Sequence, residues 1–245
     1  LGMVEMIMSG TTTVCDSYFF PDSIAAVALE SGMRAVICAG FADFPLPGIP
    51  DPARNVALAE AFLDRWTGLS DRLRPALFCH APYTCSPGTM QSVKDVARRR
   101  DALFMTHLAE TSGEVEETRA RYGMTPLRHC DRLGLLDEKT VLVHCVWLDD
   151  GEITILAGTG AGVSHCPESN MKLAAGIAPV ADMHARGITV GLGTDGAASN
   201  NDLDLFGEMA AAAGIHRLAG GDPRVMDGRT VLKMATLDGA RLLGL

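Results

Sequence analysis

Six polar side chains that can bind a metal ion or move protons stand where apolar runs of the sequence end. They are Asp16, His80, His107, His144, His165 and Asp195. Imidazole nitrogens and carboxylate oxygens are suitable ligands for a borderline divalent cation, and a catalytic zinc site keeps one position open for water. One histidine at the end of a strand is more often a structural hydrogen-bonding group. Their repetition at equivalent places predicts a shared site that uses a metal ion.

His107 begins the motif H-L-A-E, which places Glu110 three residues beyond the end of an apolar run. A loop that turns into the next helix can bring the Glu110 carboxylate back over the same edge of a sheet. Thr111 and Glu114 have the T-x-x-E spacing of a capping box, which predicts the start of that helix. The alternative for Glu110 is a solvated charge that the dipole at a helix N-terminus stabilises.

Asp195 lies in the segment G-L-G-T-D-G-A-A-S-N-N, where an apolar run gives way to small residues. Small residues allow the backbone to approach a ligand closely, and an aspartate can both bind metal and accept a proton from water. The structural alternative is that Asp195 caps the following helix. Asp202 is better placed for that cap, because Leu203 and Phe206 follow it.

Short apolar runs alternate with helical patterns along the whole chain. The predicted strands are Thr11–Asp16, Arg34–Ala39, Pro75–His80, Leu103–Leu108, Thr140–Cys145, Gly162–His165 and Thr189–Thr194, and the predicted helices include Asp22–Ser31, Ala53–Trp66, Thr89–Arg100, Ser112–Tyr122 and Pro179–Arg186. This alternation predicts an α/β fold with a parallel sheet, because parallel neighbours need a long connection. Seven strands are one short of a closed (β/α)8 TIM-type barrel, whose functional groups gather at the C-terminal rim. A doubly wound sheet would usually carry G-x-G-x-x-G after its first strand, and this chain does not.

The composition restricts the partners of the protein. The chain has 245 residues, 47% of them hydrophobic, and a formal net charge of -9, which disfavours binding to a nucleic-acid backbone. No apolar run approaches the roughly 20 residues that a spanning helix needs. Seven scattered cysteines form no C-x-x-C pair and are predicted to be free thiols. We expect a soluble, cytoplasmic protein that acts on a small molecule, with no nucleic-acid or membrane partner and with a homo-oligomer left open.

The chain resembles the amidohydrolase superfamily in four motifs, which are H-L-A-E-T, H-C-V, S-H-C-P-E-S-N-M-K-L-A-A-G-I-A-P-V and G-T-D-G-A-A-S-N-N-D-L-D-L-F. The resemblance runs from Glu5 to the closing A-T-L-D-G-A-R-L-L-G-L, essentially the whole chain. It is most similar to the branch of 5-methylthioadenosine/S-adenosylhomocysteine deaminases, related aromatic-base deaminases and triazine hydrolases. The resemblance implies a hydrolytic deaminase in which a metal activates water to attack an adenine-type nucleoside and release ammonia.

By this resemblance, one divalent metal, zinc or alternatively iron, is bound by His107 from the fifth barrel strand and Asp195 from the eighth. Two further ligands in the family come from an H-x-H motif that ends the first strand, and this sequence contains no H-x-H. We therefore expect residues 1–245 to form an amidohydrolase-type barrel domain that is incomplete at both ends. It would lack the first strand and the family's β-sandwich, and be inactive by itself.

The resemblance also implies roles for the other site residues. Glu110 shuttles protons near the ring nitrogen, His144 polarises the attacking water or steadies the developing oxyanion, and Asp195 joins them as a catalytic residue. Glu5 matches a residue that binds ribose hydroxyls, and His80 matches a further substrate-binding histidine. Members that bind homocysteine carry an arginine where this chain is expected to have Ala39. This difference favours adenosine or 5′-methylthioadenosine over S-adenosylhomocysteine.

Two other functions remain open on the sequence. One is removal of a different ring substituent, either chloride from a triazine or the amine of a guanine- or pterin-type ring. Glu110 favours deamination over loss of chloride, because ammonia leaves more easily once protonated. The other is a catalytically silent barrel fragment, for which the missing H-x-H is the only support. His165 could line the site, although its S-H-C-P context supplies no second ligand, and the remaining histidines, His129, His184 and His216, are expected at the surface or in packing.

Overall fold

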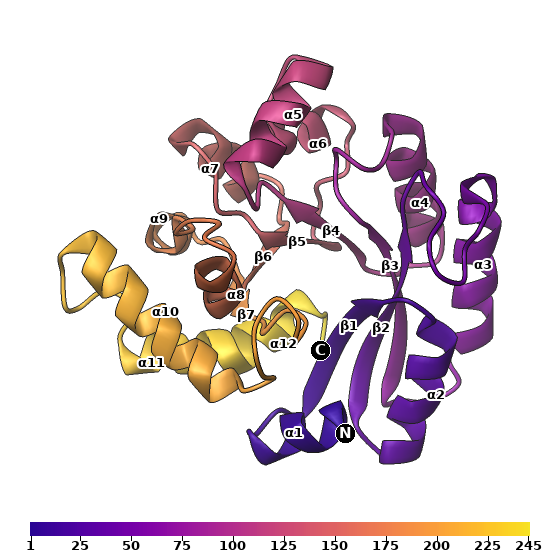
Figure 1. The fold of residues 1–245 in the computed structure, drawn as a ribbon, viewed down its shortest axis with the longest axis horizontal. Coiled ribbons are helices and arrows are strands. Elements are labelled where there is room, and N and C mark those ends of the chain that lie inside the picture. The colour runs from indigo at the N-terminus through magenta and orange to yellow at the C-terminus, as the bar shows by residue number, and fades with distance from the viewer.

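The computed structural model describes residues 1–245 as an α/β fold built on one parallel sheet. The seven strands are hydrogen-bonded in chain order. They are β1 Thr13–Tyr18, β2 Arg34–Phe41, β3 Leu73–Cys79, β4 Phe104–Leu108, β5 Thr140–His144, β6 Gly162–His165 and β7 Val190–Leu192. The sheet curls into a half-barrel with β1 and β7 as its open edges (Figure 1). The predicted parallel α/β architecture is therefore confirmed.

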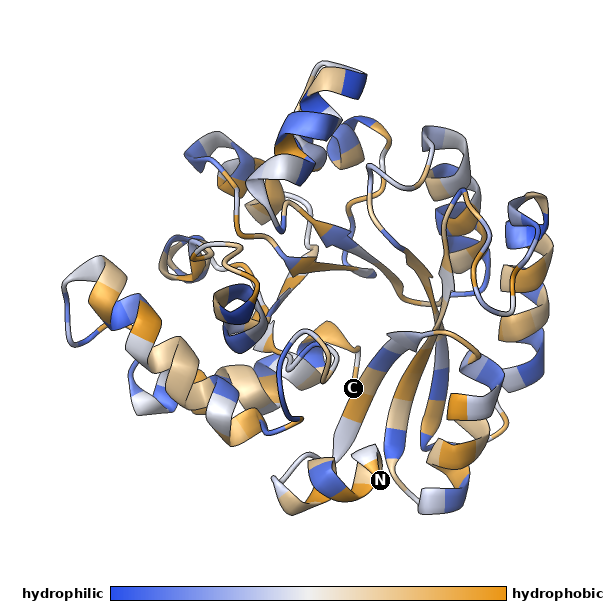
Figure 2. Cartoon of the chain, in the orientation of Figure 1, coloured by the Kyte–Doolittle hydropathy of each residue, from blue (hydrophilic) through white to orange (hydrophobic).

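Twelve α-helices flank the curled sheet; most lie on its outer face, and the last lies on the concave side (Figure 1). They are α1 Gly2–Met8, α2 Pro21–Ser31, α3 Asn55–Trp66, α4 Pro87–Arg99, α5 Ser112–Tyr122, α6 Pro126–Arg132, α7 Asp150–Ala157, α8 Pro167–Lys172, α9 Val180–Ala185, α10 Leu205–Gly220, α11 Gly228–Lys233 and α12 Gly239–Leu242, with a 3-10 turn at Pro52–Arg54 and a π-helical turn at Met234–Asp238. Figure 2 shows hydrophobic residues along the strands and mixed residues along the helices. None of the helices combines the length and the apolarity that crossing a membrane requires.

The two faces of the sheet enter two separate hydrophobic cores. On β2, Ile37 and Ala39 belong to the large core under the helices, while Val36 and Cys38 belong to a smaller core on the concave face. This division follows from the strand geometry, because successive side chains point to opposite faces. The same rule decides which side chains at the strand ends can reach a site on the concave side.

The C-terminal segment closes the concave face at the N-terminal ends of the strands. Leu242 lies so close to Gly191 that a Cβ added there would be 2.8 Å from Leu242 Cδ1. On the neighbouring strand, a Cβ added at Gly162 would likewise clash with Leu242. Arg74 Nη1 donates a hydrogen bond of 2.6 Å to the carbonyl of Gly244. These contacts leave the opposite, C-terminal ends of the strands as the accessible rim.

Several predicted boundaries were wrong around β7. Only Val190–Leu192 is paired as a strand, where Thr189–Thr194 was predicted. The helix that follows begins at Leu205, and its N-cap is Asp204, whose side chain accepts from the amide of Phe206. Asp202 is not that cap, because its Oδ1 instead accepts from the amide of Asp204. The short turns formed by the Asp202 and Asp204 side chains thus delay the start of the helix.

Candidate active site

Three histidines meet at the C-terminal ends of neighbouring strands. His80 follows β3, His107 lies near the end of β4 and His144 ends β5. The ring centroids of His80 and His107 are 5.1 Å apart, and those of His107 and His144 are 5.5 Å apart with the rings stacked. Phe78 of the concave core packs edge-on against His107 at 4.8 Å. The structure therefore brings together three of the residues that the sequence singled out.

His107 is held as a neutral imidazole with one free nitrogen. Its Nδ1 lies 2.9 Å from the carbonyl oxygen of His80, which can only accept, so Nδ1 carries the proton and Nε2 keeps its lone pair. Burial lowers the pKa of His107 to about 3, and the neighbouring His144 and His80 add to this effect. The negative charge of the Asp195 carboxylate acts in the opposite direction and raises the pKa of His107.

Glu110 is positioned by a loop whose amides are bound to Glu114. The Glu114 carboxylate accepts from the amide of Ala109 at 2.9 Å and from the amide of Glu110 at 2.7 Å. Ala109 adopts a left-handed φ of 50°, which turns the chain after β4. The predicted capping box is only half correct, because Thr111 does accept from the Glu114 amide, whereas the Glu114 side chain does not return to Thr111.

The turn after β4 brings Glu110 to His144. Glu110 Oε2 lies 3.8 Å from His144 Nε2, and His144 is 1% exposed. The backbone of His144 has a φ of 73° and that of Cys145 a φ of 50°, so two successive left-handed residues end β5. His144 Nδ1 lies 3.0 Å from Asn170 Oδ1. Its two ring nitrogens thus face an amide on one side and a carboxylate on the other.

Asp195 is held by neutral donors. Its Oδ2 accepts from Ser169 Oγ at 2.8 Å, and its Oδ1 accepts from the amide of Gly196 at 2.8 Å. No cation pairs with this carboxylate, which leaves its charge available to a ligand. The residue itself has a φ of 60°, which bends the chain away from β7.

The donor set suits part of a metal site. A neutral imidazole with a free Nε2 and an unpaired carboxylate are both ligands that zinc accepts. No group of three or more His, Cys, Asp or Glu side chains is arranged to hold a metal ion. The chemistry of the His107 ring and of the Asp195 carboxylate is thus compatible with metal binding.

The two expected substrate-binding residues lie in different surroundings. His80 is bound to Thr84, with 2.8 Å between Nδ1 and Oγ1, and burial lowers its pKa. Glu5 lies on α1, where its Oε1 accepts from the amide of Leu203 at 3.0 Å. Leu203 belongs to the segment that follows Asp195, so Glu5 is tied to the rim through that segment rather than through the histidines.

Ala39 does not occupy a place from which an arginine would reach the concave face. Its side chain is 4% exposed and belongs to the core under the helices, together with Ile37 and Phe41. The argument against a homocysteine-bearing substrate depended on this position facing the site. Strand alternation removes that argument.

His165, which the sequence allows to line the site, does not point toward it. Its side chain points to the helical layer, where its Nε2 lies 3.0 Å from Nε2 of His216 on α10. Both rings are buried, and burial lowers the pKa of His216 to about 4. His129 stacks on Tyr122 at 4.0 Å. Of the two roles expected for His129 and His216, surface or packing, both residues have the packing role.

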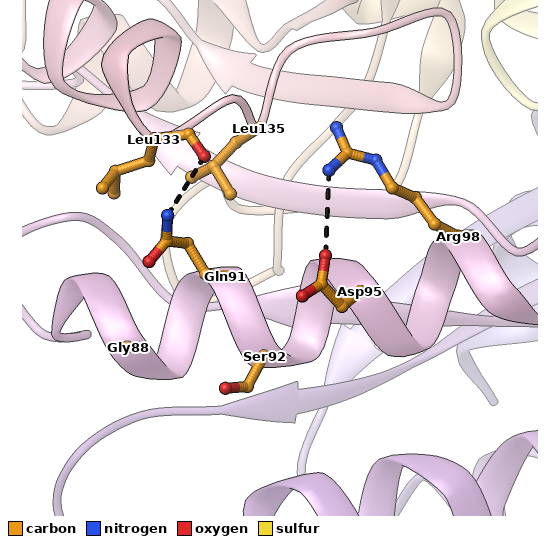
Figure 3. Close-up of a pocket in the computed structure, with 7 residues that line it drawn as sticks. All are labelled: Gly88, Gln91, Ser92, Asp95, Arg98, Leu133 and Leu135. Atoms are coloured by element: carbon orange, nitrogen blue, oxygen red, sulfur yellow. Dashed lines mark hydrogen bonds and ion pairs between the residues drawn. The ribbon is translucent and has the colours of Figure 1, made fainter.

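A surface cavity of about 480 Å³ lies away from these residues. Figure 3 shows it between α4 and the segment after α6, where Gln91 Nε2 donates to the carbonyl of Leu133 at 3.4 Å and Arg98 pairs with Asp95 at 3.8 Å. It contains none of the strand-end residues, so it is separate from the candidate site.

Comparison with known proteins agrees with this geometry. The sequence model of the amidohydrolase family matches residues 1–245. The chain belongs to the amidohydrolase family. It is 46% identical over 245 residues to the 5-methylthioadenosine/S-adenosylhomocysteine deaminase of Syntrophobacter fumaroxidans, covering 100% of this chain and 56% of that protein. The chain thus spans about half the length of the curated relatives it matches.

Solved structures show the same fold. A zinc-bound adenosine deaminase from Xanthomonas campestris superposes with a TM-score of 0.96 at 39% identity, over 99% of this chain and 55% of that one. A zinc complex of atrazine chlorohydrolase from Arthrobacter aurescens TC1 superposes with a TM-score of 0.92 at 26% identity, over 99% of this chain and 58% of that one.

Proposed function

We propose that this chain supplies the acid–base and substrate-binding residues of a metal-dependent deaminase of an adenine-type nucleoside. The observation that carries the proposal is the approach of Glu110 Oε2 to 3.8 Å from His144 Nε2, next to the neutral His107 ring. A carboxyl group and an imidazole that face each other at a strand-end rim are suited to moving protons at one reacting centre.

His107 through Nε2 and Asp195 through its carboxylate would hold the metal, with zinc as the first choice and iron as the alternative. Zinc is supported by the zinc-bound adenosine deaminase and the zinc complex of the chlorohydrolase. When bound, a divalent metal makes water a nucleophile at neutral pH. The remaining ligands would come from the H-x-H motif of an eighth strand, placed between the open edges of β1 and β7.

The protein side chains then carry the proton transfers. Hydrolytic deamination replaces an exocyclic amino group by oxygen, so protons must move from the added water to a ring nitrogen and to the departing ammonia. Glu110 can take up and deliver these protons, because it is a carboxyl group on a loop fixed by two hydrogen bonds. His144 offers the Nε2 lone pair to a hydrogen of the attacking water and so orients it.

Glu5 and His80 would bind the sugar. A carboxylate accepts hydrogen bonds from vicinal hydroxyls, which a free base lacks. A site with such a carboxylate should favour nucleosides over free rings, because only the ribose offers hydroxyl donors to it. Since Ala39 faces the helices, adenosine, 5′-methylthioadenosine and S-adenosylhomocysteine all remain substrates to be compared.

Loss of chloride from a triazine is the second candidate function. The chlorohydrolase with a TM-score of 0.92 favours it as far as the fold is concerned. The proton-carrying Glu110 favours deamination, because ammonia must be protonated to leave and chloride need not be.

The test compares kcat/KM of the zinc-loaded, full-length protein for these three nucleosides, free adenine, an aminotriazine and a chlorotriazine. We expect a nucleoside to be preferred. Glu5→Gln should lower kcat/KM for the nucleosides while leaving the low value for adenine unchanged. A preference of the wild-type protein for a ring without sugar would refute the nucleoside proposal, and faster release of chloride than of ammonia would establish the second candidate instead.

A further inference from the structure

Two consecutive residues of α8 each bind one side chain of the proposed site. Ser169 Oγ donates to Asp195 Oδ2 at 2.8 Å, and Asn170 Oδ1 lies 3.0 Å from His144 Nδ1. Asp195 follows β7 and His144 ends β5, so α8 is placed between two strand ends that are not neighbours in the sheet. One short helix therefore bridges a proposed metal ligand and a proposed catalytic histidine.

The two residues are polar side chains buried in the protein, so the partners of their hydrogen bonds explain why they occur there. Ser169 is 0% exposed and Asn170 is 2% exposed. Asn170 Nδ2 is buried and has no hydrogen-bond partner, so the only side-chain hydrogen bond of this amide is the one to His144. A buried amide whose only role was packing would lower the stability of the fold, because each buried polar group without a hydrogen bond costs free energy. The hydrogen bond to His144 is the visible reason for an asparagine at this place.

α8 is itself fixed to the segment that follows Asp195. Glu208 of α10 is 0% exposed, and its carboxylate accepts from the amide of Glu168 at 3.2 Å and from Asn200 Nδ2 at 2.6 Å. The same Asn200 nitrogen donates to the carbonyl of Thr194 at 3.0 Å. At the other end of α8, Lys172 Nζ donates to the carbonyl of Ala198 at 3.1 Å. The helix and the loop are thus held together as one unit.

We propose that α8 is a positioning element of the site. Asn170 fixes the ring plane and the tautomer of His144, and Ser169 fixes the carboxylate orientation of Asp195. The catalytic consequence of this arrangement rests on the proposed function, whereas the tautomer and the carboxylate orientation are properties of the fold. Neither residue touches the reacting atoms, so both act through the side chains they hold.

The chemistry of the Asn170 contact defines the tautomer. An amide oxygen can only accept, so Nδ1 of a neutral His144 must carry the proton. Nε2 then presents a lone pair toward Glu110. The reversed amide would instead donate to Nδ1 and place the proton on Nε2, which would turn His144 from an acceptor into a donor at the site. The tautomer therefore decides between two orientations of the amide.

The first measurement begins with the wild-type protein and is then repeated on an Asn170 variant. Nitrogen-15 NMR of the histidine rings in the full-length, zinc-loaded wild-type protein reports which nitrogen of neutral His144 is protonated, with His144→Gln used to assign the signal. We expect the Nδ1–H form. Asn170→Ala should allow the Nε2–H form to appear and should lower kcat about 10- to 100-fold with little change in KM, which is the usual size of such effects around metal sites.

The second measurement concerns Asp195. Ser169→Ala should weaken zinc binding about 10- to 100-fold in competition with a chelator. Ser169→Thr should retain most of the affinity, because threonine keeps the hydroxyl. Met171→Ala is the matched control, since Met171 belongs to the same helix and is 47% exposed. This control should change neither the tautomer nor the zinc affinity.

These readouts separate the inference from the proposed function. If the wild-type protein deaminates no nucleoside but shows the expected tautomer and zinc affinities, the proposed function fails and the positioning role stands. An Nε2–H tautomer in the wild-type protein would overturn the role of Asn170, and unchanged zinc affinity in Ser169→Ala would overturn that of Ser169. Both outcomes are informative even for an active deaminase.

Discussion

Replacement of Glu114 by glutamine should make the stability of the protein less dependent on pH. Glu114 is 6% exposed, and burial raises its pKa to about 7 from an ordinary value of 4.5, although two backbone amides donate to it. At about 1.4 kcal/mol for each pKa unit, this difference corresponds to about 3 kcal/mol. The side chain is almost completely buried, so solvent screening reduces this figure little.

The sign follows from proton binding. Between pH 4.5 and 7 the folded chain keeps the Glu114 proton while the unfolded chain loses it, so the folded state binds more protons. The free energy of unfolding of the wild-type protein therefore falls as pH rises through this window, and this contribution is constant above it. Glutamine cannot titrate. In the lower part of this window glutamine replaces a protonated carboxyl group, which likewise offers one carbonyl acceptor and one donor, and only above about pH 7 does it replace a carboxylate with two acceptors.

The assay is urea unfolding of the wild-type and Glu114→Gln proteins at intervals from pH 5 to pH 8, followed by tryptophan fluorescence. The free energy of unfolding of the wild-type protein, measured relative to that of Glu114→Gln, should fall by about 2–3 kcal/mol between pH 5 and pH 8. Glu116→Gln is the control, because Glu116 lies on the same helix and is exposed. Its difference from wild type should not depend on pH in this range. A Glu114→Gln difference that is constant or grows with pH would refute the reasoning.

Three further substitutions test the site and the packing. In the full-length protein, Glu110→Gln should keep the metal and the fold but lose about 10²–10⁴-fold in turnover, and near-normal turnover would remove Glu110 from the mechanism. Lys94→Met should destabilise the protein by about 1–3 kcal/mol in urea unfolding, because the variant loses the hydrogen bond of 2.6 Å from the buried ammonium to Asp137, which still pairs with Arg98 at 3.0 Å. Gly162→Ala should cost about 1–3 kcal/mol through its clash with Leu242, and Leu242→Ala in the same chain should remove much of that cost, which a double-mutant cycle measures.

The sheet could be predicted because its strands are short apolar runs separated by helix-length segments. Gly162–His165 matches the predicted strand at both ends, and Arg34 begins both the predicted and the observed β2. The strand-end histidines followed from the same pattern, since a polar residue after an apolar run marks where the chain leaves the core. The histidines at the ends of β3, β4 and β5 do meet at one rim.

The side of the sheet on which a strand-end residue lies could not be predicted. His144 and His165 both end strands in similar sequences, L-V-H-C and V-S-H-C. His144 has a φ of 73°, whereas no such backbone angle is found at His165, whose ring points to α10. A left-handed residue that is not glycine depends on the surrounding structure, and the sequence carries no mark of it.

The role of α8 could not be predicted from the sequence for a different reason. The helix has six residues, too few to show a helical period, and Ser169 and Asn170 sit in the polar stretch P-E-S-N, which resembles an exposed loop. Each of its two contacts spans 26 residues, from His144 to Asn170 and from Ser169 to Asp195. These 26 residues along the chain separate α8 from the end of β5 in one direction and from the residue that follows β7 in the other. α8 follows β6, and β5 and β7 are the two strands that pair with β6, so neighbouring residues of α8 can reach side chains at the ends of both strands.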